Sequence, residues 1–439
     1  MNLIPSIYHM NRSVIKIILL SAGLFSLSIK TYALAALPQT EPVADTLKLN
    51  IKDAENRLLQ NNLQFLAQKY NVNIAEAQVI TAKLFPNPDF SFTNGIHATQ
   101  VANAASQQSA TLSQLIQTAG KRNNSIQLAK IGVTQSKYQL FDLLRTLRYT
   151  LRTDFYSIYY QQQSAKVYQE EINSLAKTLE VFKQQYAAGN IAQKEVLRIQ
   201  SQLYSLQGEY SNLLTSIDTT ASEFKLLIRA NPDQPVAPVI DIDSDQQKLT
   251  SVPYQQLIDS ANVNRYDLRL AKSQVDYNNI NLKLQKSMAV PDFSLSVNYD
   301  KLGSYGNNFI GAGIEFNLPF FNRNQGGIKQ ARLAISQSQL QLQSQTDAVQ
   351  SQLSTYYRLA QRQEQLSNSI DPSFDKNFTR LIKGVFDNYQ KRNISLLEFL
   401  DFYDSYKNTT LQINNLKQAK MASLEQLNYV TGTPFFNNK

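Results

Sequence analysis

The hydrophobic positions of this chain change period several times, and the changes divide it into helices and strands. Over residues 47–84 apolar side chains recur at threes and fours, which predicts one helix that ends at Pro86. Over 90–93 and 107–116 they alternate with polar side chains, which predicts two short strands. Residues 123–186 return to the helical period without a proline, so a helix of about 96 Å is expected at 1.5 Å per residue.

The same order of periods occurs a second time. Residues 293–299 and 310–318 alternate as strands, and a helical pattern starts at about 326 and continues to about 430. An interruption at Asp371-Pro372 and a turn at 391–393 divide that helical stretch, as Gly189 divides the first one.

Short motifs repeat at a constant offset. Pro88-Asp89-Phe90-Ser91 recurs as Pro291-Asp292-Phe293-Ser294, 203 residues later. Tyr186, Asn190, Ile191, Glu195 and Leu197 recur at the same offset as Tyr389, Asn393, Ile394, Glu398 and Leu400. We therefore expect two structural repeats, 36–229 and 257–439, joined by an irregular, proline-containing linker over 230–256.

The first 35 residues are typical of a signal peptide. Arg12 and Lys16 form a basic start, an apolar stretch follows, and Ala33-Leu34-Ala35 fits a cleavage site. A membrane anchor helix is the alternative, although the apolar stretch is short for a span. The pattern predicts an exported protein.

Composition excludes several classes of site. The chain has no cysteine and only two histidines, so disulfides and thiolate metal centres are excluded and a histidine-rich metal site is disfavoured. The formal net charge is +9, but basic residues are scattered among acids, which indicates solvated helix faces and no nucleic-acid surface. The sequence shows no phosphate loop and no nucleophile with a histidine partner, so we expect neither an enzyme nor a cofactor.

Strands that are apolar on one face and polar on the other occur in membrane barrels and in soluble sandwiches. The leader favours the membrane. Four strands cannot close a barrel, and an open sheet edge is not tolerated in lipid, so several chains would have to share one barrel. The polar faces would then line a water-filled pore, with the candidates Ser294, Ser296, Asn298, Glu315 and Asn317.

The chain resembles the TolC-type outer membrane efflux family. The motifs that carry the resemblance are 84–88 before the first strand, Gly120-Lys121-Arg122 at the strand-to-helix junction, and 186–190 with 195–197 at the helical turn. The second repeat adds 318–326 and 389–400. The residues before strand one, Pro86-Asn87-Pro88, and those of 321–326 are most similar to the heavy-metal (cation) branch of this family.

The resemblance implies a mainly helical trimer with a shared twelve-stranded β-barrel in the outer membrane and a periplasmic α-barrel. It implies the passive exit duct of a tripartite efflux pump, supplied by a periplasmic adaptor protein and an inner-membrane proton-driven pump, for metal cations or drugs. Two other functions stay open: a duct for polypeptide secretion, and a soluble periplasmic coiled-coil scaffold.

The two helical turns are the expected adaptor-docking residues. Past the second turn, Glu398 and Asp401 share one helix face, and Asp404 extends it by a turn. In a trimer these acids would form rings that favour cations, which the resemblance places at the periplasmic gate. A solvated acidic helix face is the alternative. Packing between helices is the interpretation, and binding of aromatic drugs the alternative, for Tyr156, Tyr159, Tyr160, Tyr356 and Tyr357. The docking candidates are Ala188, Gly189, Asn190, Arg392, Asn393 and Ile394.

Overall fold

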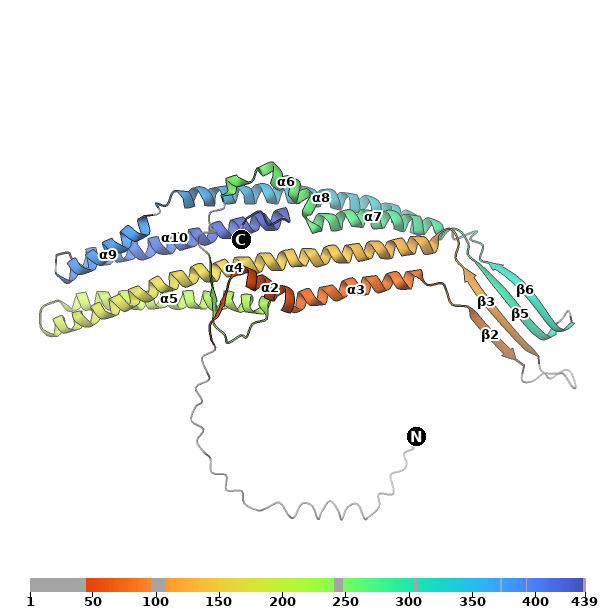
Figure 1. Cartoon of the computed structure of the whole chain (residues 1–439), viewed down its shortest axis with the longest axis horizontal. Coiled ribbons are helices and arrows are strands. Elements are labelled where there is room, and N and C mark those ends of the chain that lie inside the picture. Colours follow the sequence, from red (N-terminus) through yellow and green to blue (C-terminus); the bar gives the residue numbers. More distant parts are fainter. Residues whose placement is uncertain are drawn as a thin grey trace, which may run out of the picture. The chain divides into compact units, whose positions relative to one another are not determined.

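The computed structural model describes residues 45–95, 107–240, 248–303, 306–371, 373–391 and 393–436, and residues 46–439 form one compact unit (Figure 1). The expected signal peptide over 1–35 lies outside the described residues. The elements are β1 (Leu47–Leu49), α2 (Ile51–Asn61), α3 (Leu63–Lys83), β2 (Asp89–Asn94), β3 (Gln108–Ile116), α4 (Lys121–Ala187), α5 (Gln193–Ile228), β4 (Val236–Pro238), the 3₁₀ turn η2 (Leu249–Ser251), α6 (Tyr254–Asn264), α7 (Tyr266–Ser287), β5 (Phe293–Gly303), β6 (Gly306–Phe316), α8 (Gln325–Asn368), α9 (Phe374–Gln390) and α10 (Leu396–Thr431).

The first predicted helix is wrong in one respect, because the structure divides residues 47–84 into β1, α2 and α3. The break lies at Asn62, whose side-chain oxygen accepts the N–H of Phe65 at 2.9 Å and so caps α3. Its amide group also donates to the carbonyl of Leu227 on α5 at 3.0 Å. The helical period continues across the break, which is why the sequence alone indicated one helix.

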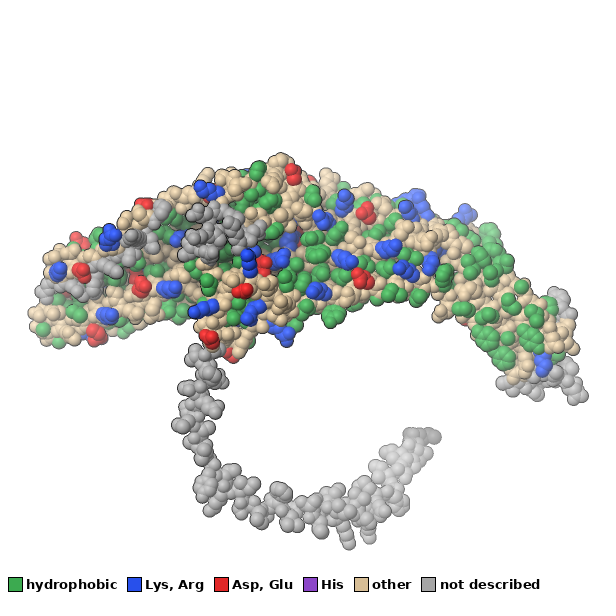
Figure 2. Space-filling view, in the orientation of Figure 1, with side chains coloured by type: hydrophobic (Ala, Val, Ile, Leu, Met, Phe, Trp, Pro, Cys, Tyr) green, Lys and Arg blue, Asp and Glu red, His purple; other side chains and the backbone are tan. Residues whose placement is uncertain are grey.

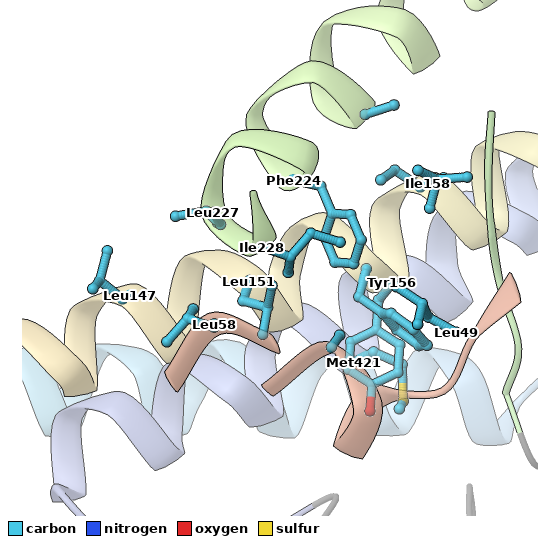
Figure 3. Close-up of a cluster of buried hydrophobic side chains, with 14 of the residues drawn as sticks. Leu49, Leu58, Leu147, Leu151, Tyr156, Ile158, Phe224, Leu227, Ile228 and Met421 are labelled. Atoms are coloured by element: carbon cyan, nitrogen blue, oxygen red, sulfur yellow. The ribbon is translucent and has the colours of Figure 1, made fainter. Parts of the chain in front are cut away.

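The predicted long helix is confirmed. α4 has 67 residues and extends for about 100 Å at 1.5 Å per residue. Its expected apolar seam is buried where α4 lies against α2, α5 and α10, as Leu151 and Tyr156 show in Figure 3. Tyr160 is buried in the same cluster and Tyr159 packs against it, so the packing interpretation of these tyrosines is confirmed.

The linker is more regular than expected. Within 230–256, β4 pairs in parallel with β1, opposing Val236 to Leu47, and η2 and the start of α6 follow. Leu249 is buried, and its N–H donates to Glu364 of α8 at 2.7 Å. The prolines disfavour a helix here, but they leave the carbonyl acceptors that a two-stranded pairing needs.

Over the expected second repeat, α7, the hairpin of β5 and β6, and then α8, α9 and α10 follow one another as α3, the hairpin of β2 and β3, α4 and α5 do over the expected first one. The expected interruption is present between α8 and α9, although Pro372 itself lies outside the described residues. Tyr356 and Tyr357 pack against the buried cluster that α6, α8 and α10 share, as predicted.

The four longer strands form one antiparallel sheet in the order β2-β3-β5-β6. The register opposes Phe90 to Leu112, and Leu112 to Val297 on the next strand. Because side chains alternate along a strand, this register gathers the apolar residues on one face and the polar residues on the other.

The apolar face of the sheet is exposed in the single chain. Figure 2 shows hydrophobic side chains over much of the visible face of the strands. None of the described helices is long and apolar enough to cross a membrane. The exposed apolar side chains of this face include Phe90, Phe92, Leu112, Leu295, Val297, Tyr299, Ile310, Ile314 and Phe316.

Candidate functional site

The turn between α4 and α5 is a glycine-dependent helix cap. Gly189 has a φ of 76°, a left-handed conformation that most side chains avoid. The N–H of Gly189 donates to the carbonyl of Tyr186, and that of Asn190 donates to the carbonyl of Gln185 at 2.8 Å. These two bonds define a Schellman motif in which Ala188 is the C-cap residue of α4. The turn is therefore a fixed structure at the end of the first helical hairpin.

The turn between α9 and α10 keeps the one of these two hydrogen bonds that joins residues five apart in the sequence. The N–H of Asn393 donates to the carbonyl of Asn388 at 2.9 Å, as Asn190 does in the first repeat. The side-chain amide of Asn393 donates to Asn388 as well. Arg392, which replaces the glycine, lies outside the described residues, whereas Ile394 packs against the buried cluster between the two hairpins.

An aromatic stack joins the ends of the two hairpins. Phe182 of α4 lies against Tyr389 of α9, with ring centroids 5.7 Å apart, and Tyr389 stacks on Phe399 of α10 at 4.4 Å. A groove of about 1010 Å³ lies beside this stack. Its lining includes Gly189, Asn190, Glu195, Tyr389, Ile394, Ser395 and Leu396. The structure thus brings residues of both predicted turns to one groove.

Glu398 is part of a helix cap. The N–H and the hydroxyl of Ser395 both donate to Glu398 Oε2 at 2.8 Å, and the N–H of Glu398 donates to the Ser395 hydroxyl at 3.2 Å. This is a capping box at the start of α10. The hydrogen bonds from Ser395 lower the pKa of Glu398, so the carboxylate is charged at neutral pH while it serves the cap.

The other two acids of the predicted ring differ in their surroundings. Asp401 is exposed and makes no hydrogen bond or ion pair with any described residue. Asp404 accepts a hydrogen bond from Gln202 of α5 at 3.0 Å and lies 3.6 Å from Lys407. The structure therefore leaves Asp401 exposed, whereas Asp404 bonds to the other hairpin.

A buried charge network joins the hairpins behind these acids, and sequence reasoning missed it. Lys407 is only 5% exposed, and its ammonium group lies 3.1 Å from Glu209 of α5. Glu171 of α4 is buried beside it with one carboxylate oxygen unpaired. Burial raises the pKa of Glu171 to about 8, although Lys407 opposes the shift. Lys407 lies on the apolar face of α10 between Leu400 and Leu411. A charged residue among apolar positions is the sequence feature that indicates this buried network.

The first repeat carries an acid and a base at the positions of the first two acids of the predicted ring. Glu195 and Arg198 stand where Glu398 and Asp401 stand in the second repeat, but among the described residues no ion pair joins them. Glu195 instead lines the groove at the hairpin ends. The spacing put the two side chains on one helix face, but exposed pairs gain little from contact.

The polar face of the sheet carries four of the five predicted pore-lining residues. Ser294 opposes Glu315 across β5 and β6, while Ser296 and Asn298 oppose Gly313 and Gly311. A Cβ atom on Gly311 would lie 2.6 Å from Asn298 Oδ1, so glycine makes room for the polar side chain there. The fifth, Asn317, lies one residue beyond the end of β6, so its place on the pore-lining face stays a prediction.

The described residues contain no cluster of histidine, aspartate or glutamate that could hold a metal ion. The predicted site residues instead separate into two places: the ends of the helical hairpins and the polar face of the sheet.

Residues 55–228 match the family model of the outer membrane efflux protein. The chain is 20% identical over 284 residues to the cobalt-zinc-cadmium resistance protein CzcC of Cupriavidus metallidurans. That alignment covers 64% of this chain and 66% of CzcC, so the chain spans just under two thirds of this relative.

Solved channels share the fold. The CmeC outer membrane channel of Campylobacter jejuni has a TM-score of 0.72 at 14% identity, over 89% of this chain and 87% of CmeC. The outer membrane protein VceC of Vibrio cholerae has a TM-score of 0.69 at 14% identity, over 88% of this chain and 96% of VceC. At this identity the structural similarity concerns the fold alone, which this chain shares with both outer membrane proteins.

Proposed function

We propose that the chain belongs to the TolC-type outer membrane efflux family and that three copies of it form the exit duct of a tripartite efflux pump. The duct spans the outer membrane through a shared twelve-stranded barrel and continues into the periplasm as a tube of long helices. Transport through it is passive, and an inner-membrane proton-driven pump and a periplasmic adaptor supply energy and substrate.

The observation that carries the proposal is the exposed apolar face of an open sheet. β2 and β6 each have a free edge among the described strands, and side chains such as Phe92 and Ile310 are exposed. In water such a sheet is costly and invites aggregation. In lipid it is favourable once neighbouring chains satisfy the two edges. The opposite face, with Ser294 and Glu315, then lines an aqueous pore.

The hairpin ends are the proposed periplasmic gate and docking site. The groove beside Gly189 and Ile394 is suited to an adaptor, because it is bounded by fixed turns and an aromatic stack. Glu398 and Asp401 contribute acidic rings at this end, and such rings favour cations by electrostatics. Together with the similarity to CzcC, this supports divalent metal cations as the substrate class.

The test is conductance of the purified full-length protein. A detergent-solubilised species with the mass of three chains, and cation-selective channels in a planar bilayer, would support the duct. Extraction without detergent and no conductance would instead support the soluble scaffold. A deletion strain distinguishes the substrates. Its sensitivity to zinc, cobalt and cadmium is compared with its sensitivity to common drugs, and its secretion of polypeptides is measured separately.

A further inference from the structure

The start of β5 is held by the junction that joins β3 to α4. Thr118 donates its N–H to Asp292 Oδ1 at 2.7 Å and its hydroxyl to the carbonyl of Pro291 at 2.6 Å. Lys121 forms an ion pair with the same carboxylate at 2.7 Å. A residue of the second repeat is thus anchored by the first repeat.

Asp89 is the equivalent of Asp292 in the first repeat, because both belong to the repeated Pro-Asp-Phe-Ser motif. Its side chain is exposed and makes no hydrogen bond or ion pair with the described residues. It lies at the start of β2, which is an edge strand of the sheet. Asp89 therefore lacks the anchor that its counterpart has.

The junction between β6 and α8 is the equivalent of the anchoring junction. Gly120 and Asn324 are the residues before the two long helices, and both are left-handed, with φ of 73° and 54°. Leu112 opposes Phe90 as Phe316 opposes Phe293, so residues 113–120 correspond to 317–324. Asn322 accordingly stands where Thr118 stands in the first repeat.

The two junctions differ in whether their strand has a partner. In the first repeat β3 extends past β2, and its last residues, Leu115 and Ile116, oppose Ser294 and Phe293 of β5. In the second repeat residues 317–320 continue past the start of β5 with no strand beside them in the described chain, and in the free chain the N–H of Phe320 donates to the carbonyl of Leu318 at 3.0 Å. Leu318, Phe320 and Phe321 are 61%, 67% and 96% exposed.

We propose that residues 317–320 of one chain pair with β2 of a second copy and bring Asn322 and Arg323 against Asp89 of that copy. The inference rests on the proposed function, because it specifies how the shared barrel closes. Asn322 donates in place of Thr118. Arg323, one residue further, supplies the positive charge, since Gln325 stands where Lys121 does.

The charges of the free chain fit this contact. Arg323 donates from Nε to its own Phe320 carbonyl at 3.3 Å, but no described carboxylate pairs with it. Asp89 is an unpaired acid at the opposite edge of the same sheet. A contact between unlike edges is head-to-tail, and such a contact generates a closed ring when its rotation closes. Each chain would offer Arg323 to one neighbour and Asp89 to the other.

The test is site-directed cross-linking, which the absence of cysteine in the chain makes selective. Asp89→Cys with Asn322→Cys, treated with a short bismaleimide in isolated membranes, should give species of two and three chains on a denaturing gel. The matched control is Thr118→Cys with Asp292→Cys, whose contact is within one chain and should add no mass.

The cross-link and the conductance answer separate questions. The inference is overturned if the gel shows only single chains for the Asp89/Asn322 cysteine pair while the control pair reacts within its chain. This holds even if the wild-type protein conducts as a trimer. An intermolecular product supports the inference, whereas absent conductance of the wild-type protein counts against the duct.

Charge exchange is the second measurement. Asp89→Arg and Arg323→Asp should each lower the temperature at which the oligomer dissociates in detergent, and the double variant should recover at least half of the loss. If the decreases in dissociation temperature of the two single variants simply add in the double variant, a direct pair between Asp89 and Arg323 is contradicted.

Discussion

Glu398 and Asp401 lie on one face of α10, but they do different work in the structure. The carboxylate of Glu398 accepts both hydrogen bonds of the capping box, whereas Asp401 has no partner among the described residues. A change at Glu398 therefore alters the helix start and the local charge together, while a change at Asp401 alters the charge alone.

This difference separates selectivity from folding at the proposed gate. Asp401→Asn should lower the cation-over-anion permeability ratio of single channels by at least about twofold, because it removes one charge per chain from an acidic ring. Ser395→Ala keeps both acids but breaks the cap, so it should cost about 1 kcal/mol of stability and leave selectivity unchanged. Glu398→Ala with Asp401→Ala should show both effects. Unchanged selectivity in the double variant would refute the acidic ring.

Glu171 gives the periplasmic helices a pH-dependent stability. Its pKa is raised from 4.5 to about 8 by burial, so the folded chain holds this proton more tightly than the unfolded chain does. Protonation of Glu171 therefore favours the folded chain. Its contribution to the free energy of unfolding is fully present below pH 4.5 and is lost as the pH rises through about 8.

Glu171→Gln should remove this dependence. At pH 9 the variant should be more stable than the wild-type protein by up to about 4 kcal/mol, at roughly 1.4 kcal/mol per pKa unit, and the two should converge near pH 5. Unfolding midpoints measured from pH 5 to 9 test it, with Glu180→Gln, an exposed acid on the same helix, as the control. Parallel pH profiles would contradict the assignment.

At the scale of elements, the two faces of the sheet suit different environments: the apolar face suits lipid and the polar face suits water. Leu112 is exposed on the apolar face of β3, and Thr111, its neighbour in the chain, lies on the polar face. The two positions differ by one residue along the same strand, so a matched substitution compares the faces directly.

Leu112→Arg should therefore disrupt membrane insertion, whereas Thr111→Arg should be tolerated. An arginine on the lipid face costs about 2–4 kcal/mol at the bilayer centre and less near its surfaces, but an arginine in an aqueous pore stays hydrated. Thr111→Arg should instead reduce cation conductance. The measurements are the yield of oligomer in outer membranes and single-channel current. Equal yields of the two variants would contradict the assigned faces.

On the scale of the whole molecule, contacts between the two hairpins hold their ends together. Lys407 of α10 pairs with Glu209 of α5, and the hydroxyl of Tyr403 lies 2.6 Å from that of Ser174 on α4. If the duct opens by separation of the hairpins, these contacts oppose the opening.

Lys407→Met with Tyr403→Phe should consequently raise the single-channel conductance or the open probability, because these two polar links between the hairpins are lost while the side-chain volumes are nearly kept. Lys183→Met is the control, since Lys183 pairs with Glu180 three residues away on the same helix. Conductance that matches the control in the double variant would show that the gate does not depend on this network.

The sequence by itself determined the long helices, the four longer strands and their order. The periods of α4, β5 and β6 were readable, because a long helix and a half-exposed strand repeat their apolar residues at fixed intervals. Gly189 was readable because a left-handed cap favours glycine. The break at Asn62 and the pairing of β1 with β4 were not, since both depend on residues far apart in the chain.

Only the tertiary structure decided which polar residues are free to act. Glu398, Asp401 and Asp404 are alike as a sequence pattern, yet one caps a helix, one is free and one bonds to the other hairpin. The anchoring of Asp292 and the unpaired state of Asp89 also follow from strand order and not from the shared motif. Periodicity reports the face on which a side chain lies, whereas its partner is set by packing between segments that the sequence separates by many residues.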